Sequence, residues 1–287
     1  MGTSDTITRF APSPTGHLHL GHAHSALFAA REAGAGTFLV RMEDIDPGRC
    51  RPEFEQSILE DLRWLGLRWP EPVRRQSDHM DDYRAALDRL AGMDLLYPCF
   101  CTRKQIQDEI AAAGHAPHGI PSGPDGALYP GTCRGMDAGE RAERLAAGDG
   151  HALRLKTDEA VRQAGPLSWH DHKEGRQGAH PEIFGDAVLA RKETPTSYHL
   201  AVTVDDALQG VTLVTRGSDL FLASHLHRLL QALLDLPVPD YHHHGLLTGA
   251  DGKRLAKRDK AATIRSLRDA SKTSAEVRAL AGFEDGA

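Results

Sequence analysis

The sequence predicts a doubly wound α/β fold on a parallel sheet, with one inserted subdomain and a short helical tail. A β-rich run at residues 6–10 leads through a Pro/Gly turn into a helical pattern, and a second β-rich run follows at 37–42. Strand, turn, helix and strand in this order begin such a fold. Strand and helix patterns return from residue 186. We expect a discontinuous α/β domain at 1–98 and 186–250, an insertion at 99–185, and a basic loop with a helical tail at 251–287.

The first elements follow from hydrophobic spacing and from turn residues. Residues 22–33 have helical spacing, and glycines at 34 and 36 end the predicted helix. The ranges 53–65 and 80–93 have amphipathic spacing and predict two further helices. In doubly wound sheets ligands bind beyond the carboxyl ends of the strands. Both the turn at Gly16 and the acidic pair Glu43 and Asp44 fall at such ends.

The remaining elements surround the insertion. Its Gly/Pro-rich loop runs from residue 114 to 131, and a loop that long inside a compact domain is usually functional or mobile. Beyond the insertion the pattern predicts strands at 186–191, 211–217 and 241–248, an apolar helix at 220–234 and a turn at 249–252.

Composition and charge limit the function classes. The chain has 287 residues, a net charge of −6 and four cysteines, which exclude a disulfide scaffold and a general nucleic-acid coat. Residues 251–272 nevertheless hold eight Lys or Arg against three Asp, enough for a local phosphate-contacting patch. No secretory signal or apolar run of membrane-spanning length is visible. We expect a cytoplasmic protein with neither membrane nor DNA as a partner.

The turn at residues 9–22, Arg-Phe-Ala-Pro-Ser-Pro-Thr-Gly-His-Leu-His-Leu-Gly-His, has the chemistry of a phosphate site. A helix N-terminus offers unpaired N–H groups and a partial positive charge. Gly21 allows close approach of a nucleotide, and His19 and His22 can donate hydrogen bonds to phosphate oxygens. The basic loop at 253–258, Lys-Arg-Leu-Ala-Lys-Arg, supplies cations far downstream. Together these segments predict an enzyme that handles ATP phosphates without covalent catalysis.

These segments resemble the class I aminoacyl-tRNA synthetases, specifically the glutamyl branch. The chain carries, in the order found in that branch, the segment 9–21, the strand end Arg41-Met42-Glu43-Asp44-Ile45-Asp46, the strand Val214-Thr215-Arg216-Gly217, and the loop 253–258. The resemblance spans residues 7 to about 260 and implies a Rossmann-type catalytic domain. In one departure, Ala256 stands where the family usually has serine before its motif lysine, Lys257.

The resemblance implies that the carboxylate of L-glutamate attacks the α-phosphorus of ATP. His19, Gly21 and His22 would bind ATP on one side and Lys257 on the other, with Mg²⁺ on the phosphates. This chemistry needs in-line positioning and charge neutralisation rather than a general base. The serine hydroxyl that Ala256 lacks would affect rate rather than reaction type.

Glutamate binding requires cations for two carboxylates and an anion for the ammonium group. Carried over from the family, Arg9 and Arg216 are the cations, and Glu43 is the ammonium partner. Arginine suits a carboxylate because its planar fork binds both oxygens. The resemblance adds Tyr198 as a residue lining the amino-acid pocket and Ser13 as a hydroxyl donor.

The insertion contains a predicted zinc site. Cys99 and Cys101 open it and Cys133 follows the long loop, and thiolates favour tetrahedral Zn²⁺. The residues themselves leave the fourth ligand open between His115, His118 and Tyr129. A short paralogue within the glutamyl branch has the same Cys-x-Cys and Tyr-x3-Cys pattern with tyrosine as a ligand, which implies Tyr129. Cys50 lies apart as a packed or free thiol.

Three consecutive histidines, at 242–244, also suggest metal binding. They fall within the predicted strand at 241–248, where successive side chains point to opposite faces. Three adjacent histidines on a strand cannot all face one ion. We therefore do not expect a site formed by this trio.

The acceptor of the activated glutamate is suggested by the shortness of the tail after the basic loop. Only about thirty residues lie beyond that loop, whereas a glutamyl synthetase that charges tRNA carries an anticodon-binding region there. The short paralogue lacks that region and transfers glutamate to the queuosine base at the wobble position of tRNA(Asp), so we expect the tRNA(Asp) anticodon loop as a partner. Three other interpretations stay open: the catalytic part of a synthetase charging the tRNA 3′ end, a small-molecule nucleotidyltransferase, and an inactive RNA-binding relative.

Overall fold

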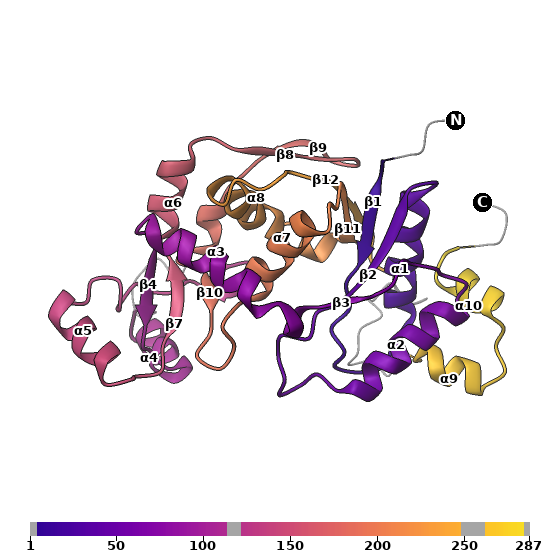
Figure 1. Cartoon of the computed structure of the whole chain (residues 1–287), viewed down its shortest axis with the longest axis horizontal. Coiled ribbons are helices and arrows are strands. Elements are labelled where there is room, and N and C mark those ends of the chain that lie inside the picture. Colours follow the sequence, from indigo (N-terminus) through magenta and orange to yellow (C-terminus); the bar gives the residue numbers. More distant parts are fainter. Residues whose placement is uncertain (1–4, 114–121, 248–261, 284–287) are drawn as a thin grey trace.

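A parallel three-stranded sheet begins the chain (Figure 1). The structure is a computed structural model that describes residues 5–113, 122–247 and 262–283. The sheet has the order β1-β2-β3, with Ile7 opposite Thr37 in the first pair. Its strands are β1 (Ile7–Phe10), β2 (Thr37–Met42) and β3 (Arg74–Arg75). The predicted strand at 37–42 is therefore confirmed residue for residue.

A second sheet continues the parallel arrangement beside β1. Its order is β11-β12-β8-β9, and only β9 runs antiparallel to its neighbour. The Thr212 amide donates to the Ile7 carbonyl at 3.0 Å, which joins the start of β11 to β1. The chain thus adds strands outward from β1 on one side and from β11 on the other. The strands are β8 (Ser168–Asp171), β9 (Gly175–Gly178), β11 (Leu213–Gly217) and β12 (Asp240–His244).

The predicted α/β fold with a parallel sheet is confirmed, and its switch point lies between β1 and β11. At such a point the connections leave in opposite directions, which opens a crevice at the carboxyl ends of the strands. Helices cover the sheets, and four predicted helices are present with ends shifted by at most three residues. They are α1 (Leu20–Ala33), α2 (Pro52–Trp64), α3 (Met80–Gly92) and α8 (Ala223–Leu233). A further helix, α7 (Tyr198–Leu208), was not predicted from the sequence.

Helix α1 begins two residues before the predicted start at His22. The side chain of His19 caps it, because His19 Nδ1 accepts a hydrogen bond from the Gly21 amide at 3.1 Å. His22 Nδ1 accepts from the His19 amide at 3.3 Å, which completes a reciprocal cap. Histidine is not among the usual N-cap residues, so the sequence did not predict this start.

The insertion and the segments that flank it form an antiparallel sheet at one end of the molecule (Figure 1). Its order is β10-β7-β4. We expected the α/β pattern to resume with a strand at 186–191; β10 lies there but pairs antiparallel with β7, and parallel pairing resumes only at β11. The elements here are β4 (Leu96–Cys99), α4 (Arg103–Ala113), β5 (Ser122–Gly123), β6 (Gly126–Ala127), α5 (Ala138–Ala146), β7 (Ala152–Leu155), α6 (Thr157–Ala164) and β10 (Val188–Ala190).

The helical tail packs on the N-terminal half through α9 (Ile264–Asp269) and α10 (Ser274–Leu280). Ile264, Val277 and Ala281 join the core formed by α1, α2 and the first sheet. Arg268 also donates to the buried Asp61 of α2 at 2.9 Å. The tail thus returns the chain to the first sheet, at the end of the molecule opposite the insertion (Figure 1).

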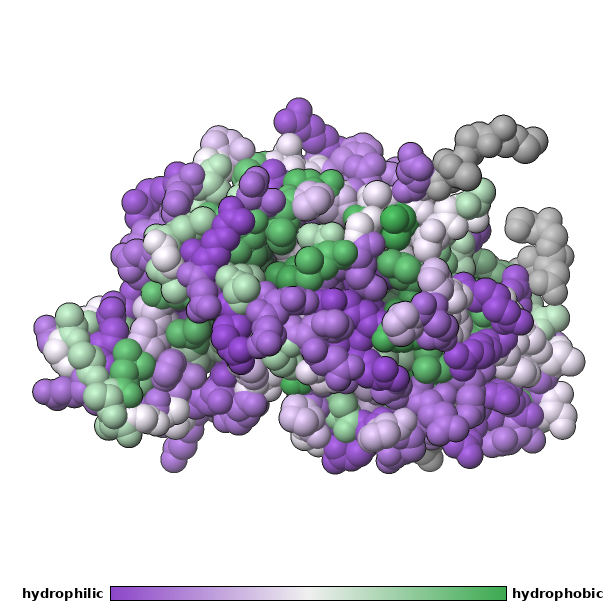
Figure 2. All heavy atoms as spheres, in the orientation of Figure 1, coloured by the Kyte–Doolittle hydropathy of each residue, from purple (hydrophilic) through white to green (hydrophobic). Residues whose placement is uncertain are grey.

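The surface is predominantly hydrophilic on the face shown in Figure 2, and hydrophobic residues there form separate groups rather than one continuous patch. Among the helices that the structure describes, none combines the length and apolar character needed to cross a lipid bilayer.

Candidate active site

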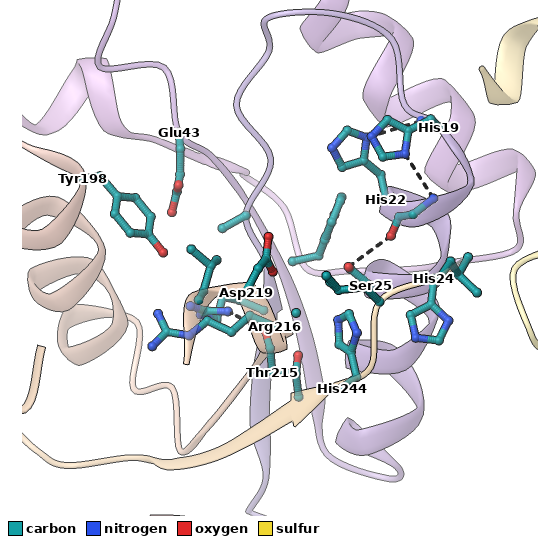
Figure 3. Close-up of a pocket in the computed structure, with 18 residues that line it drawn as sticks. His19, His22, His24, Ser25, Glu43, Tyr198, Thr215, Arg216, Asp219 and His244 are labelled. Carbon is teal, nitrogen blue, oxygen red and sulfur yellow. Dashed lines mark hydrogen bonds between the residues drawn. The ribbon is translucent and has the colours of Figure 1, made fainter. Parts of the chain in front are cut away.

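A cavity of about 290 Å³ opens at the switch point, between the carboxyl ends of β1, β2 and β11 and the N-terminus of α1 (Figure 3). Seven of the predicted site residues line it, although they come from segments more than two hundred positions apart in the sequence. They are Arg9, His19, Gly21, His22, Glu43, Tyr198 and Arg216.

The N-terminus of α1 forms one side of the cavity. The rings of His19 and His22 stack there with centroids 3.8 Å apart. A side chain at Gly21 would bring its Cβ to 3.0 Å from His19 Cε1 and 3.1 Å from Nδ1. Glycine therefore allows the His19 ring to fold over the helix end. The arrangement presents amides, imidazoles and the helix dipole to an anion.

The other side of the cavity contains Arg216, at the end of β11 (Figure 3). Its side chain is buried, and no carboxylate of the described residues lies within 4.0 Å of it. The next residue, Gly217, has no room for a side chain, because a Cβ there would lie 2.5 Å from Asp219 Oδ1 and 2.9 Å from Leu246 Cδ2. The Arg216-Gly217 pair thus places a cationic side chain next to a backbone segment that packs closely against Asp219 and Leu246.

Arg9 and Arg41 share one buried carboxylate. Asp206 Oδ1 accepts from Arg9 Nε at 2.9 Å and lies 2.8 Å from Arg41 Nη2. Burial opposes ionisation of Asp206, but the two guanidinium groups outweigh it and hold its pKa below the usual value. Arg9 Nη1 also donates to the Thr215 carbonyl at 3.0 Å, which joins β1 to β11 across the switch point.

Glu43 lies at the end of β2 with its side chain toward the cavity (Figure 3). Burial raises its pKa to about 7, against the opposing pull of Arg41 and Arg9. Glu43 Oε1 is 3.5 Å from Arg41 Nη2. This carboxyl therefore changes charge near neutral pH and can meet an ammonium group. The hydroxyl of Tyr198, on α7, points into the same space (Figure 3).

The sequence reasoning missed the acids that support these cations. Asp205 is fully buried and accepts from Arg74 Nε at 2.8 Å, Gln76 Nε2 at 2.8 Å and Tyr83 Oη at 3.0 Å. With Asp206 it lies on the apolar helix α7. Two adjacent acids in an otherwise apolar helical run were the available signal, because buried carboxylates require cationic or hydrogen-bonding partners.

Two predicted residues are not placed in the cavity. Ser13 is exposed and is not among the lining residues, although the preceding carbonyl of Pro12 accepts from the Glu43 amide at 3.0 Å. Lys257, with the whole basic loop at 253–258, lies outside the described residues.

The predicted zinc ligands come together at the base of the insertion. The sulfur atoms of Cys99, Cys101 and Cys133 lie within 4.8 Å of one another. Cys101 Sγ is 3.4 Å from both Cys133 Sγ and the Tyr129 hydroxyl. The alternative ligands His115 and His118 lie outside the described residues. Three sulfurs and a phenol oxygen on one point are a donor set that suits a tetrahedral metal ion.

The three consecutive histidines of β12 face different partners, as expected for a strand. His242 pairs with Glu32 at 2.9 Å and His243 with Asp171 at 2.6 Å, whereas His244 lies beside His24 with ring centroids 4.7 Å apart. His242, Glu32 and His172 do bring donor atoms within 4.8 Å of one another. The trio itself forms no common site.

Comparison with known proteins gives a consistent result. Residues 5–278 match the family model described as tRNA synthetases class I (E and Q), catalytic domain. A glutamyl-Q tRNA(Asp) synthetase of Rhodobacter capsulatus is 50% identical, over 96% of this chain and 100% of that protein. A glutamate–tRNA ligase of Aquifex aeolicus is 37% identical over 93% of this chain but only 54% of its own length.

Solved structures resemble the chain in the same way. A glutamate tRNA ligase from Elizabethkingia meningosepticum, crystallised with its amino acid, superimposes with a TM-score of 0.75 at 26% identity. The match covers 89% of this chain and 52% of that ligase, so the chain spans about half of the solved protein. Fold, motif order and family match agree. The chain belongs to the class I tRNA synthetases for glutamate and glutamine, and is a ligase-type relative of the aminoacyl-tRNA synthetases.

Proposed function

We propose that this protein activates L-glutamate with ATP and transfers it to the queuosine base at the wobble position of tRNA(Asp). The observation that carries the first half is the cavity, which joins an anion-binding helix end to two buried arginines and an ionisable carboxyl. Glutamate has complementary groups, namely two carboxylates and one ammonium.

The two sides of the cavity suggest how glutamate lies in it. The α-carboxylate is the nucleophile and must meet the α-phosphate of ATP, which belongs at the N-terminus of α1. The side-chain carboxylate then extends to the opposite side, toward Arg216 (Figure 3). Glu43 receives the ammonium group, and Arg9 and Tyr198 line the same cavity.

The chemical step needs no general base because the carboxylate is already an anion. One of its oxygens attacks the α-phosphorus, the bond to the bridging oxygen breaks, and pyrophosphate leaves. His19, His22 and the amides of α1 bind the phosphates, and Lys257 neutralises them from the basic loop. Mg²⁺ arrives with ATP and screens the phosphate charge.

Relatives support the choice of acceptor. The Rhodobacter protein named for tRNA(Asp) matches over its full length, whereas the glutamate–tRNA ligase matches over about half of its own. A catalytic domain of this kind could approach the anticodon loop directly, with the residues around 253–272 contacting phosphates.

Labelled glutamate and ATP, offered with queuosine-containing and queuosine-lacking tRNA(Asp), test the acceptor. We expect labelling of the first tRNA only. Equal labelling of both, or of tRNA(Glu), would instead indicate the charging of a tRNA end. A product that retains the nucleotide would support a small-molecule nucleotidyltransferase. If no pyrophosphate is exchanged into ATP, the result would support an inactive RNA-binding relative.

We also propose that Cys99, Cys101, Tyr129 and Cys133 hold one structural Zn²⁺ within an inserted subdomain at 99–185. The donors fit, because the sulfurs cluster and the Tyr129 hydroxyl accepts from the Cys133 amide at 2.9 Å, which fixes its oxygen beside them. Arg154 stacks on the Tyr129 ring at 3.8 Å and holds its plane. A zinc-to-protein ratio near one in chelator-free material is expected, and a ratio near zero would contradict the site.

A further inference from the structure

Arg216 is held by three uncharged acceptors. Its Nε donates to His243 Nε2 at 3.1 Å, Nη1 meets His227 Nδ1 at 3.2 Å, and Nη2 donates to Ser224 Oγ at 2.5 Å. A guanidinium group has five N–H bonds. These contacts use three and leave one N–H on each terminal nitrogen. Two such N–H groups side by side match the two oxygens of a carboxylate.

On one side of Arg216 the contacts continue to a buried acid. Because His243 Nε2 accepts from Arg216, the proton of the neutral ring lies on Nδ1. That atom is 2.6 Å from Asp171 Oδ2. Asp171 is fully buried, and its other oxygen accepts from the amides of Lys173 and Glu174 at 2.9 Å. The ring is therefore fixed in orientation and in tautomer.

On the other side the contacts pass through two histidines. His227 Nδ1 accepts from Arg216, so its proton lies on Nε2, which is 3.1 Å from His199 Nδ1. His199 Nε2 is in turn 3.1 Å from Asp125 Oδ2, in the turn between β5 and β6 of the insertion. On both sides the direction of hydrogen donation runs away from Arg216 and ends at a carboxylate.

The two histidines in direct contact with Arg216, His227 and His243, are buried and uncharged. Burial and the nearby Arg216 cation together lower the pKa of His227 well below its ordinary value and that of His243 to about 4. They can accept from the guanidinium without neutralising it. By contrast, Arg9 and Arg41 are already paired with Asp206. Of these three arginines, Arg216 is the one without a carboxylate of the described chain in contact.

We propose that His243 and His227 are positioning residues that hold Arg216 as an open two-pronged donor, and that they thereby select a carboxylate side chain over the carboxamide of glutamine. This inference rests on the proposed function, in which Arg216 receives the glutamate side chain. A carboxamide presents one oxygen and one NH₂ group to the two N–H donors, so one donor faces another. A rigid site rejects that arrangement more strongly than one in which Arg216 can rotate.

Paired substitutions test this role. His243→Phe and His227→Leu remove the acceptor, whereas His243→Gln and His227→Asn keep one close to the position of the lost nitrogen. The matched control is His225→Leu, because His225 is buried on the same helix but accepts from the His180 amide instead. The measurements are glutamate-dependent exchange of pyrophosphate into ATP, and inhibition of that exchange by glutamine.

The apolar variants should raise the KM for glutamate about tenfold or more, with the KM for ATP changed less than about twofold. In the same variants, the inhibition constant for glutamine should rise by a smaller factor than the KM for glutamate. The ratio by which the site prefers glutamate over glutamine should therefore fall. The polar variants should recover most of the loss, and His225→Leu should match the parent protein. Apolar variants with a parental KM for glutamate would overturn the proposal.

Arg216→Ala separates this proposal from the proposed function. If that variant keeps a normal KM for glutamate, Arg216 does not bind the substrate and the functional assignment fails. If it loses glutamate binding while the histidine variants do not, only the positioning role fails. Circular dichroism establishes which variants fold.

If the apolar variants do not fold, Asp171→Asn tests the hydrogen-bonded series Arg216, His243 and Asp171 from the end away from the cavity. Asparagine keeps the oxygen that accepts from the turn amides and replaces the other oxygen, which accepts from both the ring and the backbone amide of His243, with an NH₂ donor. The KM for glutamate should rise while kcat for exchange stays near the parental value. An unchanged KM would contradict the role of His243.

Discussion

The amino-acid cavity and the cysteine cluster bury polar atoms in opposite ways. At the cavity and in the buried network behind it, Arg9 and Arg41 are paired with Asp206, and Arg74 with Asp205. In the cluster, three thiols and the Tyr129 hydroxyl have mainly one another as partners. The first region carries its own counterions and is formed before substrate arrives. The second gathers electron-pair donors around one point, a donor set that suits the external cation proposed above.

This difference predicts different consequences when each region is disturbed. Loss of an internal counterion should damage both the fold and glutamate activation, because the same acids support the core and the cavity. Loss of the proposed metal should damage the insertion and leave activation largely intact. Variants that disturb one region and spare the other test this separation, beginning with the largest expected effect.

Asp206→Ala should destabilise the protein by about 3–5 kcal/mol and abolish glutamate activation, because it leaves two buried guanidinium groups without their shared partner. Urea unfolding and pyrophosphate exchange measure the two effects. Asp46→Ala is the control, since it breaks an exposed ion pair with Arg49 at 2.6 Å and should cost less than about 1 kcal/mol. Similar costs for both variants would show that the buried network contributes little.

Removal of the proposed zinc should lower the melting temperature by about 5–10 °C while the KM for glutamate changes less than about twofold. Cys101→Ser should reproduce the effect of a chelator. Cys50→Ser should not, because Cys50 lies outside the cluster. A large rise in the KM for glutamate on metal loss would show that the two regions are coupled.

The sequence predicted the parts of the site that depend on local pattern. Arg9, Glu43 and Arg216 sit at strand ends, and in a parallel sheet those ends meet at one edge, so their convergence could be expected. The family resemblance supplied their roles. The cysteine cluster was predicted because its residue types and spacing indicate their chemistry without knowledge of the fold.

The remainder depended on contacts that no local pattern records. Asp206 meets Arg9 across 197 positions of sequence, and the pairing of β10 with β7 is set by the insertion rather than by its own residues. The histidine contacts of Arg216 combine β12 and α8, and each of those histidines resembles an ordinary core or surface residue when seen alone. Such residues require the tertiary structure.

The affinity of the cavity for glutamate should depend on pH through Glu43. Below its pKa of about 7 this carboxyl is neutral and cannot pair with the ammonium group. One pH unit below that pKa, the KM for glutamate should therefore be about tenfold higher than its constant value at high pH. The unfolded chain ionises Glu43 near 4.5, so the same burial makes folding less favourable as pH rises from about 4.5 to 7. Affinity and stability should thus change in opposite directions.

Glu43→Gln provides the control for the pH profile. Glutamine keeps the size of the side chain but has no charge to gain, so the KM for glutamate should be raised and flat between pH 6 and 8. A variant that keeps the parental pH profile would assign the dependence to another group.

Gly21→Ala should have the smallest effect, and it separates the helix end from the rest of the cavity. The new Cβ would stand 3.0 Å from His19 Cε1, so the ring must move and its hydrogen bond to the residue-21 amide weakens. Alanine favours the helix by up to about 1 kcal/mol, whereas loss of a cap costs about as much, so the unfolding free energy should barely change. The displaced imidazole should instead raise the KM for ATP about three- to tenfold and leave the KM for glutamate unchanged. A rise in the KM for glutamate of the same size would mean that His19 contacts both substrates, and that the cavity is not divided between a phosphate side and an amino-acid side.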